Sequence, residues 1–473
     1  MMWLNKMPFV LIIVFFGTYF FQIFFKKIGT KYNFCAVPSF RQRHKVATPY
    51  LGGLGIVFGV LIGLFSWNLF FKDWFSQNIT LLYYVVIPFI FLSIVGLIDD
   101  RFNLDPKLRL IIQFLAAFVV IQEPSIKNIL FMWEGRVGFF TIPLALFWIV
   151  GISNAYNMVD GIDGLSGTSA TVISFSILLL SLIFDRNEQI MVPLFTSLVV
   201  SLLIFLTLNW APAKIFMGDN GSMPIGFLLA AMSISVIPKT THVSSIFGIC
   251  FMFGHLILDG FTTSALRLIN RRPMFRADRN HLHHWLLRLS FTVPGATKYF
   301  FFVGILFQLF SWINFVEQSY LGITISVSMS VIIIGLIFTL ITVVEDWKIK
   351  LFSNAVKKRS QTDLSKISLE NANVIKIDLT QIYAAQEKIG PEYNRKIIDS
   401  LEFLIRNLFR QNEASFIVES KKIVILLDST LSEKIIHLIA KRIQDRVNNF
   451  LKLYDIPIIQ DAISISIEMV SES

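Results

Sequence analysis

The sequence predicts a polytopic α-helical membrane protein with about eleven transmembrane helices and a C-terminal cytoplasmic α/β domain. Of its 473 residues, 54% are hydrophobic and only 16% are charged, and the mean hydropathy is +0.65. Apolar stretches long enough to cross a hydrocarbon core of roughly 30 Å recur up to residue 344. Polar and charged residues become much more frequent after that point. These values exclude an ordinary soluble enzyme.

Eleven apolar stretches make up the membrane domain, residues 1–344. They cover 7–25, 51–71, 81–98, 108–122, 137–153, 165–184, 190–208, 222–237, 243–266, 299–316 and 321–344. The first lacks a small-residue cleavage site and is expected to be retained as a span. The two cysteines, Cys35 and Cys250, exclude a disulfide scaffold and have no paired zinc-motif spacing.

Basic residues predict the orientation of these spans, because loops rich in Lys and Arg stay cytoplasmic. Such residues gather in the loop after the first span and in the loop after the ninth, at Arg267–Lys298. This places the N-terminus outside and the chain after Val344 inside. Up to Val344 there are 23 Lys and Arg against 14 Asp and Glu, and afterwards 19 against 18. The basic excess therefore belongs to the membrane part, where it fits topology and anionic lipids and not a nucleic acid partner.

The chain after the last span divides into a charged linker, 345–362, and a small domain, 363–473. Runs rich in Ile and Val predict strands, and 3.6-residue periodicity predicts helices. The strands are expected at 373–377, 415–419, 423–427 and 463–470, and the helices at 395–409 and 432–450.

Carboxylates gather in four polar clusters at the predicted cytoplasmic ends of spans. These clusters are Asp99-Asp100, Asn154–Gly164, Phe216–Ser222 and Asp278–His284. Closely packed carboxylates repel one another, and burial disfavours their charged forms, so a divalent cation is the expected counter-charge. Hard oxygen ligands suit Mg²⁺ or Mn²⁺, and Mg²⁺ commonly completes its shell with a phosphorylated substrate.

Two of these clusters have a purely structural interpretation when each is taken alone, whereas for Asn154–Gly164 a function is favoured. The Asp99-Asp100 pair alone is typical of a solvated helix end, and Gly-Asp-Asn-Gly alone is typical of a turn. The three histidines, His281, His283 and His284, could instead hold zinc. His255 and Asp259, four residues apart in the ninth span, fit a hydrogen-bonded structural pair at least as well as a catalytic one.

Together these segments resemble the polyprenyl-phosphate N-acetylhexosamine-1-phosphate transferases, integral membrane enzymes that start bacterial surface polysaccharides and peptidoglycan. The resemblance covers roughly residues 40–290 through five ordered motifs. They are His44–Gly53, Asp99-Asp100 with Pro106-Lys107, Asn154–Gly164, Phe216–Ser222 and Arg271–His284. The implied location is the bacterial inner membrane, with the active site on the cytoplasmic side.

The resemblance also implies roles for individual residues. Asp219 would bind Mg²⁺, and Phe216 would stack on the uracil of a UDP-sugar. The residues implied to hold the substrate are Lys45, Asn154, Asn157, Asp163, Asp278 and Arg279. The residues implied beside the reacting phosphates are Asp99, Asp100, Lys107, Asp160, His281, His283 and His284.

The implied reaction transfers a hexosamine-1-phosphate, GlcNAc-1-phosphate first, from a UDP-N-acetylhexosamine to undecaprenyl phosphate. The 272–284 segment looks like that of enzymes using simple amino sugars, although Ala277 replaces their usual proline. UDP-MurNAc-pentapeptide is the alternative donor. Attack by the lipid phosphate and a phospho-aspartyl intermediate both remain open, as does a homodimer. A transporter with a regulatory domain, or a membrane-anchored signalling protein, is the competing class.

The C-terminal domain resembles a degenerate GGDEF domain, the fold of diguanylate cyclases. Val374–Asp378, Gln386–Gly390 and Ile423–Asp428 carry the resemblance, but the signature hairpin reads Glu419-Ser420-Lys421-Lys422. Because the phosphate-binding glycines and metal-binding acids are missing, no cyclase activity is expected. An unrelated α/β module is the alternative. A GGDEF-like domain of this kind would have a regulatory or docking role, with a nucleotide or a protein partner as its ligand.

Overall fold

The computed structural model describes most of the membrane part and the core of the C-terminal part. The described residues are 5–36, 48–184, 188–237, 242–269, 282–288, 291–335, 372–380, 401, 405, 414–419, 422–428, 433–453 and 464–468. The chain separates into two compact units, Met1–Ile334 and Gly335–Ser473.

Seven helical segments of the first unit are long and apolar enough to cross a membrane. They are Met7–Lys31 (α1), Gly52–Phe70 (α2), Ile79–Phe102 (from α4, Ile79–Leu81, to α5, Ile87–Phe102), Gly138–Val159 (with α8, Thr141–Val159), Leu165–Ile183 (α9), Gln189–Asn209 (within α10, Glu188–Asn209) and Val293–Glu317 (α15). α6 (Pro106–Val120) and α7 (Pro124–Val137) are bent by 89° and together would make an eighth span. Among the described residues the structure thus supports a polytopic bundle, while the number eleven stays a prediction.

One expected span is not a single continuous helix. Residues 243–266 form two helices, α12 (Ser244–Met252) and α13 (Gly254–Ile269), separated at Phe253. Gly254 packs so closely on the ring of Phe307 that a side chain would not fit there. This close packing against α15 accompanies the break, which hydropathy alone does not reveal.

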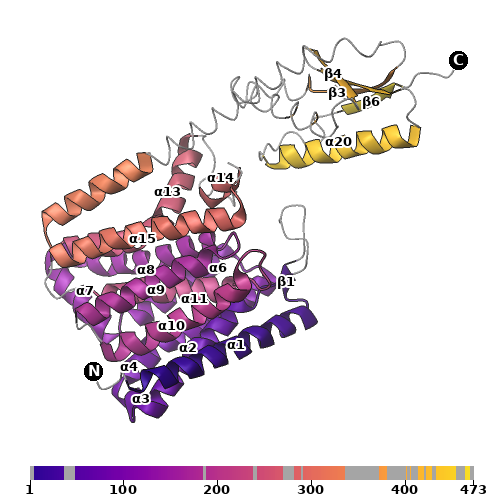
Figure 1. Ribbon diagram of the computed structural model, residues 1–473. Coiled ribbons are helices and arrows are strands. Elements are labelled where there is room, and N and C mark those ends of the chain that lie inside the picture. Colours follow the sequence, from indigo (N-terminus) through magenta and orange to yellow (C-terminus); the bar gives the residue numbers. More distant parts are fainter. Residues whose placement is uncertain are drawn as a thin grey trace. The chain divides into compact units, whose positions relative to one another are not determined.

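The central helix is α11 (Asp219–Ser235), in which every residue from Asn220 onward is buried. It packs against α2, α5, α8 and α9 (Figure 1). Small residues permit the close approach: Gly96 of α5 lies on the backbone of Asp219 and Asn220, and Gly226 of α11 lies on Ser153 of α8.

The outer helix α1 shows why the bundle suits lipid. Its buried residues Val10, Val14, Thr18 and Gln22 follow one another at four-residue steps along one face. Large aromatic side chains, among them Phe16 and Phe20, are exposed on the other face. An exposed aromatic face of this length is stable in hydrocarbon and would be a liability in water.

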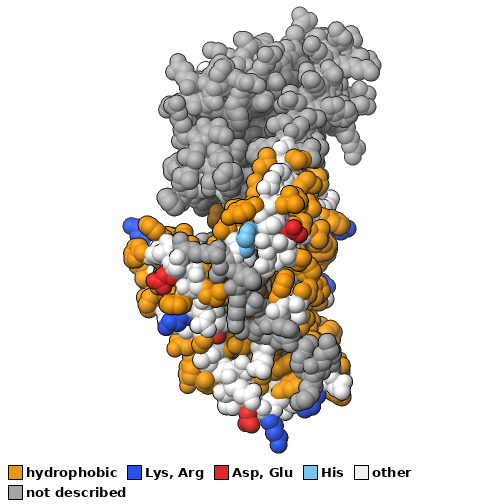
Figure 2. All heavy atoms as spheres, turned by 90° about the vertical axis from the view of Figure 1, so that its left-hand side faces the viewer, with side chains coloured by type: hydrophobic (Ala, Val, Ile, Leu, Met, Phe, Trp, Pro, Cys, Tyr) orange, Lys and Arg blue, Asp and Glu red, His pale blue; other side chains and the backbone are white. Residues whose placement is uncertain are grey.

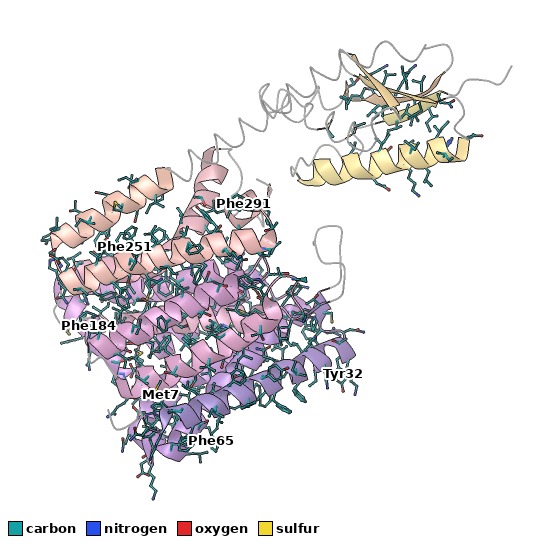
Figure 3. The ribbon with its side chains drawn as sticks, in the orientation of Figure 1. Met7, Tyr32, Phe65, Phe184, Phe251 and Phe291 are labelled. Atoms are coloured by element: carbon teal, nitrogen blue, oxygen red, sulfur yellow. The ribbon has the colours of Figure 1, made fainter. Side chains whose placement is uncertain are left out.

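The bundle has two distinct ends. Figure 3 places Tyr32 and Phe291 toward one end, and Met7 and Phe184 toward the other. The end that carries Met7 faces the viewer in Figure 2, where the coloured charged side chains are few and scattered among hydrophobic ones. Three of the four polar clusters predicted from the sequence fall at the opposite end, where α5 and α8 finish and α9 and α11 begin.

The second unit contains a four-stranded antiparallel sheet in the order β4-β5-β3-β6. The strands are β3 (Ala372–Asp378), β4 (Ala414–Glu419), β5 (Lys422–Asp428) and β6 (Ser464–Glu468), and the helix α20 spans Glu433–Leu453. Ile375 of β3 lies opposite Ile425 and Ile467, and Glu419 of β4 lies opposite Lys422 of β5. The four predicted strands and the helix at 432–450 are confirmed. Most of the helix expected at 395–409, and the whole linker, lie outside the described residues.

Candidate functional site

The carboxylate of Asp100, near the end of α5, joins this helix to the start of α11. It accepts hydrogen bonds from the backbone N–H of Asp219 at 2.9 Å and of Asn220 at 3.1 Å, and from the Asn220 amide at 2.7 Å. Gly218, which precedes α11, has a left-handed φ of 71° that favours glycine. Because a helix N-terminus presents free N–H groups and partial positive charge, the anionic side chain stabilises it.

A cation lies between two other carboxylates of this region. Arg109 of α6 donates to Asp99 at 2.6 Å, and the same guanidinium nitrogen lies 3.6 Å from the carboxylate of Asp219. Asp99 also accepts the backbone N–H of Leu104 at 2.8 Å. The Asp219 side chain is 28% exposed and that of Asp99 only 5%, so Asp219 is the carboxylate that a ligand can reach more easily.

Arg109 was missed by the sequence analysis, which chose Lys107 as the cation near the acids. Lys107 is exposed, and its backbone N–H is capped by Asp105. Helical spacing points to Arg109, because it lies four residues before Gln113, the first residue of the buried face of α6. A basic residue on the buried face of a helix faces its neighbours and not the solvent.

The segment that ends α8 meets the start of α11 from another side. The Ser222 hydroxyl donates to the Asn157 side chain, and the Asp160 carboxylate accepts from the Ser166 hydroxyl and the Gly218 backbone. Burial raises the pKa of Asp160 to about 7, and the negative charges of Asp100 and Asp163 add to this shift. Three of the four polar clusters thus meet around the first turn of α11.

Other predicted residues lie beside this centre in structural roles. Asn154 donates to Gln113 at 2.7 Å, which joins α8 to α6. Asp163 accepts the backbone N–H of Ala213 at 2.9 Å. Phe216 exchanges backbone hydrogen bonds with Pro49 and Gly52, which brings the Pro49–Gly53 part of the first motif to the same place.

The fourth cluster reaches the site through His283, on the short helix α14 (Leu282–Arg288). Its ring lies against Gly161, directly after Asp160. Lys45, Asp278, Arg279 and His281 lie outside the described residues, and so does the side chain of His284. His255 and Asp259 do not form the expected hydrogen bond, because neither ring nitrogen of His255 has a partner among the described residues, whereas Asp259 accepts the backbone N–H of Leu282.

The donor set fits Mg²⁺ better than a metal that needs a cage of protein ligands. No group of three His, Cys, Asp or Glu side chains suited to a metal occurs among the described residues. Mg²⁺ commonly uses one or two carboxylates together with water and substrate phosphate. Asp219 and Asp99, held near one another by Arg109, supply hard oxygen ligands of that kind.

Comparisons with known proteins identify the same region. The family model of glycosyl transferase family 4 matches residues 81–237. The chain is 27% identical over 288 residues to a probable undecaprenyl-phosphate N-acetylglucosaminyl 1-phosphate transferase of Bacillus subtilis, covering 60% of this chain and 78% of the relative.

Two further relatives have a higher percentage of identical residues. An undecaprenyl-phosphate alpha-N-acetylglucosaminyl 1-phosphate transferase of Salmonella typhi is 30% identical over 295 residues, again across 60% of this chain and 78% of the relative. A phospho-N-acetylmuramoyl-pentapeptide-transferase of Streptococcus pneumoniae is 32% identical over 262 residues, across 53% and 77%. These matches cover more than three quarters of the length of each relative, and the segment that the family model matches includes both Asp99 and Asp219. The chain therefore belongs to glycosyl transferase family 4.

Proposed function

We propose that this protein transfers an N-acetylhexosamine-1-phosphate, GlcNAc-1-phosphate first, from a UDP-sugar to undecaprenyl phosphate, with release of UMP. The observation that carries the proposal is the meeting of Asp100, Asp219 and Arg109 at the first turn of α11. Helix N-termini and guanidinium groups both bind phosphate, and the relatives named above act on undecaprenyl phosphate.

In the proposed reaction an oxygen of the lipid phosphate attacks the β-phosphorus of the UDP-sugar. A new P–O–P link forms, the bond between β-phosphorus and the bridging oxygen breaks, and UMP leaves with that electron pair. The lipid phosphate is already mostly dianionic at pH 7, since its second pKa is near 6. It therefore needs positioning more than a strong base.

Different residues of this chain would hold the metal, bind the phosphates and orient the acceptor. Asp219 and Asp99 would hold Mg²⁺ or Mn²⁺, which when bound neutralises charge on the diphosphate. Arg109 would turn from these carboxylates to the phosphates. Asp100 already has three N–H partners, so it would hold the α11 terminus in place. Once Arg109 has turned to the phosphates, Asp99 is the member of the pair that would orient the acceptor.

A second candidate uses UDP-MurNAc-pentapeptide as the donor. It is favoured by the 32% identity to the pneumococcal pentapeptide transferase. Both candidates share the same lipid acceptor and the same phosphate chemistry, so only the sugar-recognising part would differ.

A transporter is less well supported. Transporters place ionisable groups near the middle of their spans, whereas Asp100, Asp160 and Asp219 lie at the ends of α5, α8 and α11. We place this end at the cytoplasmic face of the bacterial inner membrane, with the N-terminus outside, because α1 ends there with the basic residues Lys26, Lys27 and Lys31.

One experiment separates these candidates. Purified protein is given undecaprenyl phosphate, Mg²⁺ and either UDP-GlcNAc, UDP-GalNAc or UDP-MurNAc-pentapeptide, and UMP release is measured. Release with UDP-GlcNAc that needs the lipid phosphate supports the proposal, and release with the pentapeptide donor alone supports the second candidate. No release with any donor contradicts both.

A further inference from the structure

Asp259 connects α13 to His283 in the interior of the first unit. Its carboxylate is 1% exposed, accepts the backbone N–H of Leu282 at 2.6 Å and lies 3.7 Å from Nδ1 of His283, which is also 1% exposed. A buried carboxylate is costly without partners. These two contacts stabilise it, and both belong to the segment that carries the predicted histidine cluster.

The other ring nitrogen of His283 faces the polar loop between α8 and α9. Nε2 lies 2.6 Å from the position that a Cβ on Gly161 would occupy. Phe300 of α15 packs edge-on against the same ring, with centroids 6.4 Å apart. The imidazole is thus fixed by α13, by α15 and by the loop, and Gly161 is the residue next to Asp160.

The loop between α8 and α9 is itself held in place by hydrogen bonds to other helices. The backbone carbonyl of Asp163 accepts from the Thr297 hydroxyl at 2.9 Å, and the backbone N–H of Gly164 donates to Asn209 at 2.9 Å. Asp160 is bonded to Ser166 and Gly218. His283 therefore faces a loop with fixed ends, and Asp160 of this loop is bonded to Gly218, the residue directly before α11.

We propose that Asp259 is a positioning residue, which acts through His283 on the transfer reaction. A carboxylate beside Nδ1 favours a proton on that nitrogen, which leaves Nε2 toward the Asp160 loop. A third group that orients an active imidazole is a common arrangement in enzymes. This inference rests on the proposed function, because the step that His283 assists is phosphosugar transfer.

The same helix supplies a matched control. His255 lies one turn before Asp259 on α13 and is equally buried, yet neither of its ring nitrogens has a hydrogen-bond partner among the described residues. If burial of a polar group on α13 were what matters, changing His255 would be as harmful as changing Asp259. If the contact with His283 matters, only Asp259 is sensitive.

The test combines kinetics with a readout that needs no turnover. Full-length Asp259→Asn, His283→Gln, the double variant and His255→Gln are purified and checked for a monodisperse state. Initial rates with UDP-GlcNAc and undecaprenyl phosphate give kcat and KM. In parallel, ¹⁵N-histidine NMR reports the ring protonation of the seven histidines, with the His283 signals assigned by their loss in His283→Gln.

We expect Asp259→Asn to lower kcat by about 10- to 100-fold, as loss of an orienting carboxylate does at other histidines, with KM for the donor changed by less than about twofold. Because Asp259 acts through His283, adding Asp259→Asn to His283→Gln should cost nothing further. The His283 signals should shift away from the Nδ1-protonated form in Asp259→Asn, and His255→Gln should change neither readout.

Two results would overturn the inference: an equal loss of kcat from Asp259→Asn with and without His283, or His283 signals unchanged by Asp259→Asn. If Asp259→Asn does not fold, the spectrum of the unaltered protein still tests the inference, which requires a proton on Nδ1 of His283. The spectrum of His283→Gln identifies the signals that belong to this ring. A wild-type protein that releases no UMP would overturn the proposed function, and the spectra alone would then decide the pairing.

Discussion

The backbone N–H of Asp219 donates to the carboxylate of Asp100 at 2.9 Å across 119 residues of sequence. This contact joins the end of α5 to the beginning of the central helix. It also separates two kinds of acid at the site, because the Asp100 carboxylate is occupied by N–H donors while the Asp219 carboxylate remains 28% exposed.

Replacing these two acids should therefore affect different properties: Asp100→Asn should lower stability, and Asp219→Asn should abolish turnover. Asp100→Asn puts an amide where a carboxylate accepts three hydrogen bonds, so we expect the free energy of unfolding to fall by about 1–3 kcal/mol. Asp219→Asn keeps the backbone donor and relieves repulsion, so Tm should hold while Mg²⁺-dependent UMP release is lost. Thermal unfolding in detergent and the transfer assay check both. Normal turnover by Asp219→Asn would remove the metal assignment.

Arg109→Gln should impair turnover and change metal binding in the resting protein. The guanidinium neutralises Asp99 and Asp219, so without it Mn²⁺ should bind more tightly in the absence of substrate, while UMP release falls by at least about tenfold. Electron paramagnetic resonance titration measures the Mn²⁺ affinity. Lys127→Gln, an exposed cation on α7, is the control. Unchanged Mn²⁺ affinity in Arg109→Gln would show that Arg109 does not compete with the metal.

Asp160→Asn should stabilise the protein at neutral and alkaline pH. Burial raises the folded-state pKa of Asp160 from 3.8 to about 7, so the folded state binds more protons than the unfolded state between these values. Stability contributed by this group is therefore lost as pH rises from about 4 to about 7. The shift corresponds to at most about 4 kcal/mol.

The measurement is Tm at pH 5 and pH 8 for both proteins. The gain from Asp160→Asn should be larger at pH 8, where the wild-type carboxylate is charged. A gain that is equal at the two pH values would mean that Asp160 does not titrate in this window. UMP release should fall in the same variant, since Asp160 holds the Gly218 backbone.

The sequence predicted the acids at this site well, because chemistry concentrates carboxylates, amides and glycines in short segments such as Phe216–Ser222. The sequence could not predict which role each of these residues has. That Asp100 caps α11 and that Asn154 turns to Gln113 depends on helix rotation and tertiary contacts. Arg109 was missed because Lys107 lies only two residues earlier, and the local sequence does not tell which of the two basic side chains faces the acids; only the buried face of the whole helix α6 identifies Arg109.

Span lengths were predicted better than span continuity. Hydropathy located α1, α2 and α9, whose apolar runs match single helices. It could not reveal the break between α12 and α13, because Phe253 and Gly254 are as apolar as their neighbours and the break accompanies packing on Phe307. In the C-terminal unit, alternation of Ile and Val was enough to place all four strands, while the strand order follows only from the structure.

Orientation can be tested with single cysteines in a variant without Cys35 and Cys250. Lys72 and Lys31 are exposed at opposite ends of the bundle, just after α2 and at the end of α1. If the N-terminus is outside, Lys72→Cys should react with a membrane-impermeant maleimide in spheroplasts, and Lys31→Cys only after permeabilisation. The reverse pattern would place the candidate site outside, away from any cytoplasmic nucleotide-sugar.

Removing residues 357–473 should leave the transfer reaction intact and change how it is regulated in cells. All described site residues lie in the first unit, Met1–Ile334, so purified truncated protein should release UMP with kcat within about twofold of the full chain. If the C-terminal domain binds a nucleotide or docks a partner, the amount of lipid-linked product in cells should change. Radiolabelled lipid extracts from cells with either form measure this, with protein levels matched by immunoblot. Equal product and equal assembly in cells would count against a regulatory domain, whereas loss of turnover by the purified truncated protein would show that the transfer reaction itself requires this domain.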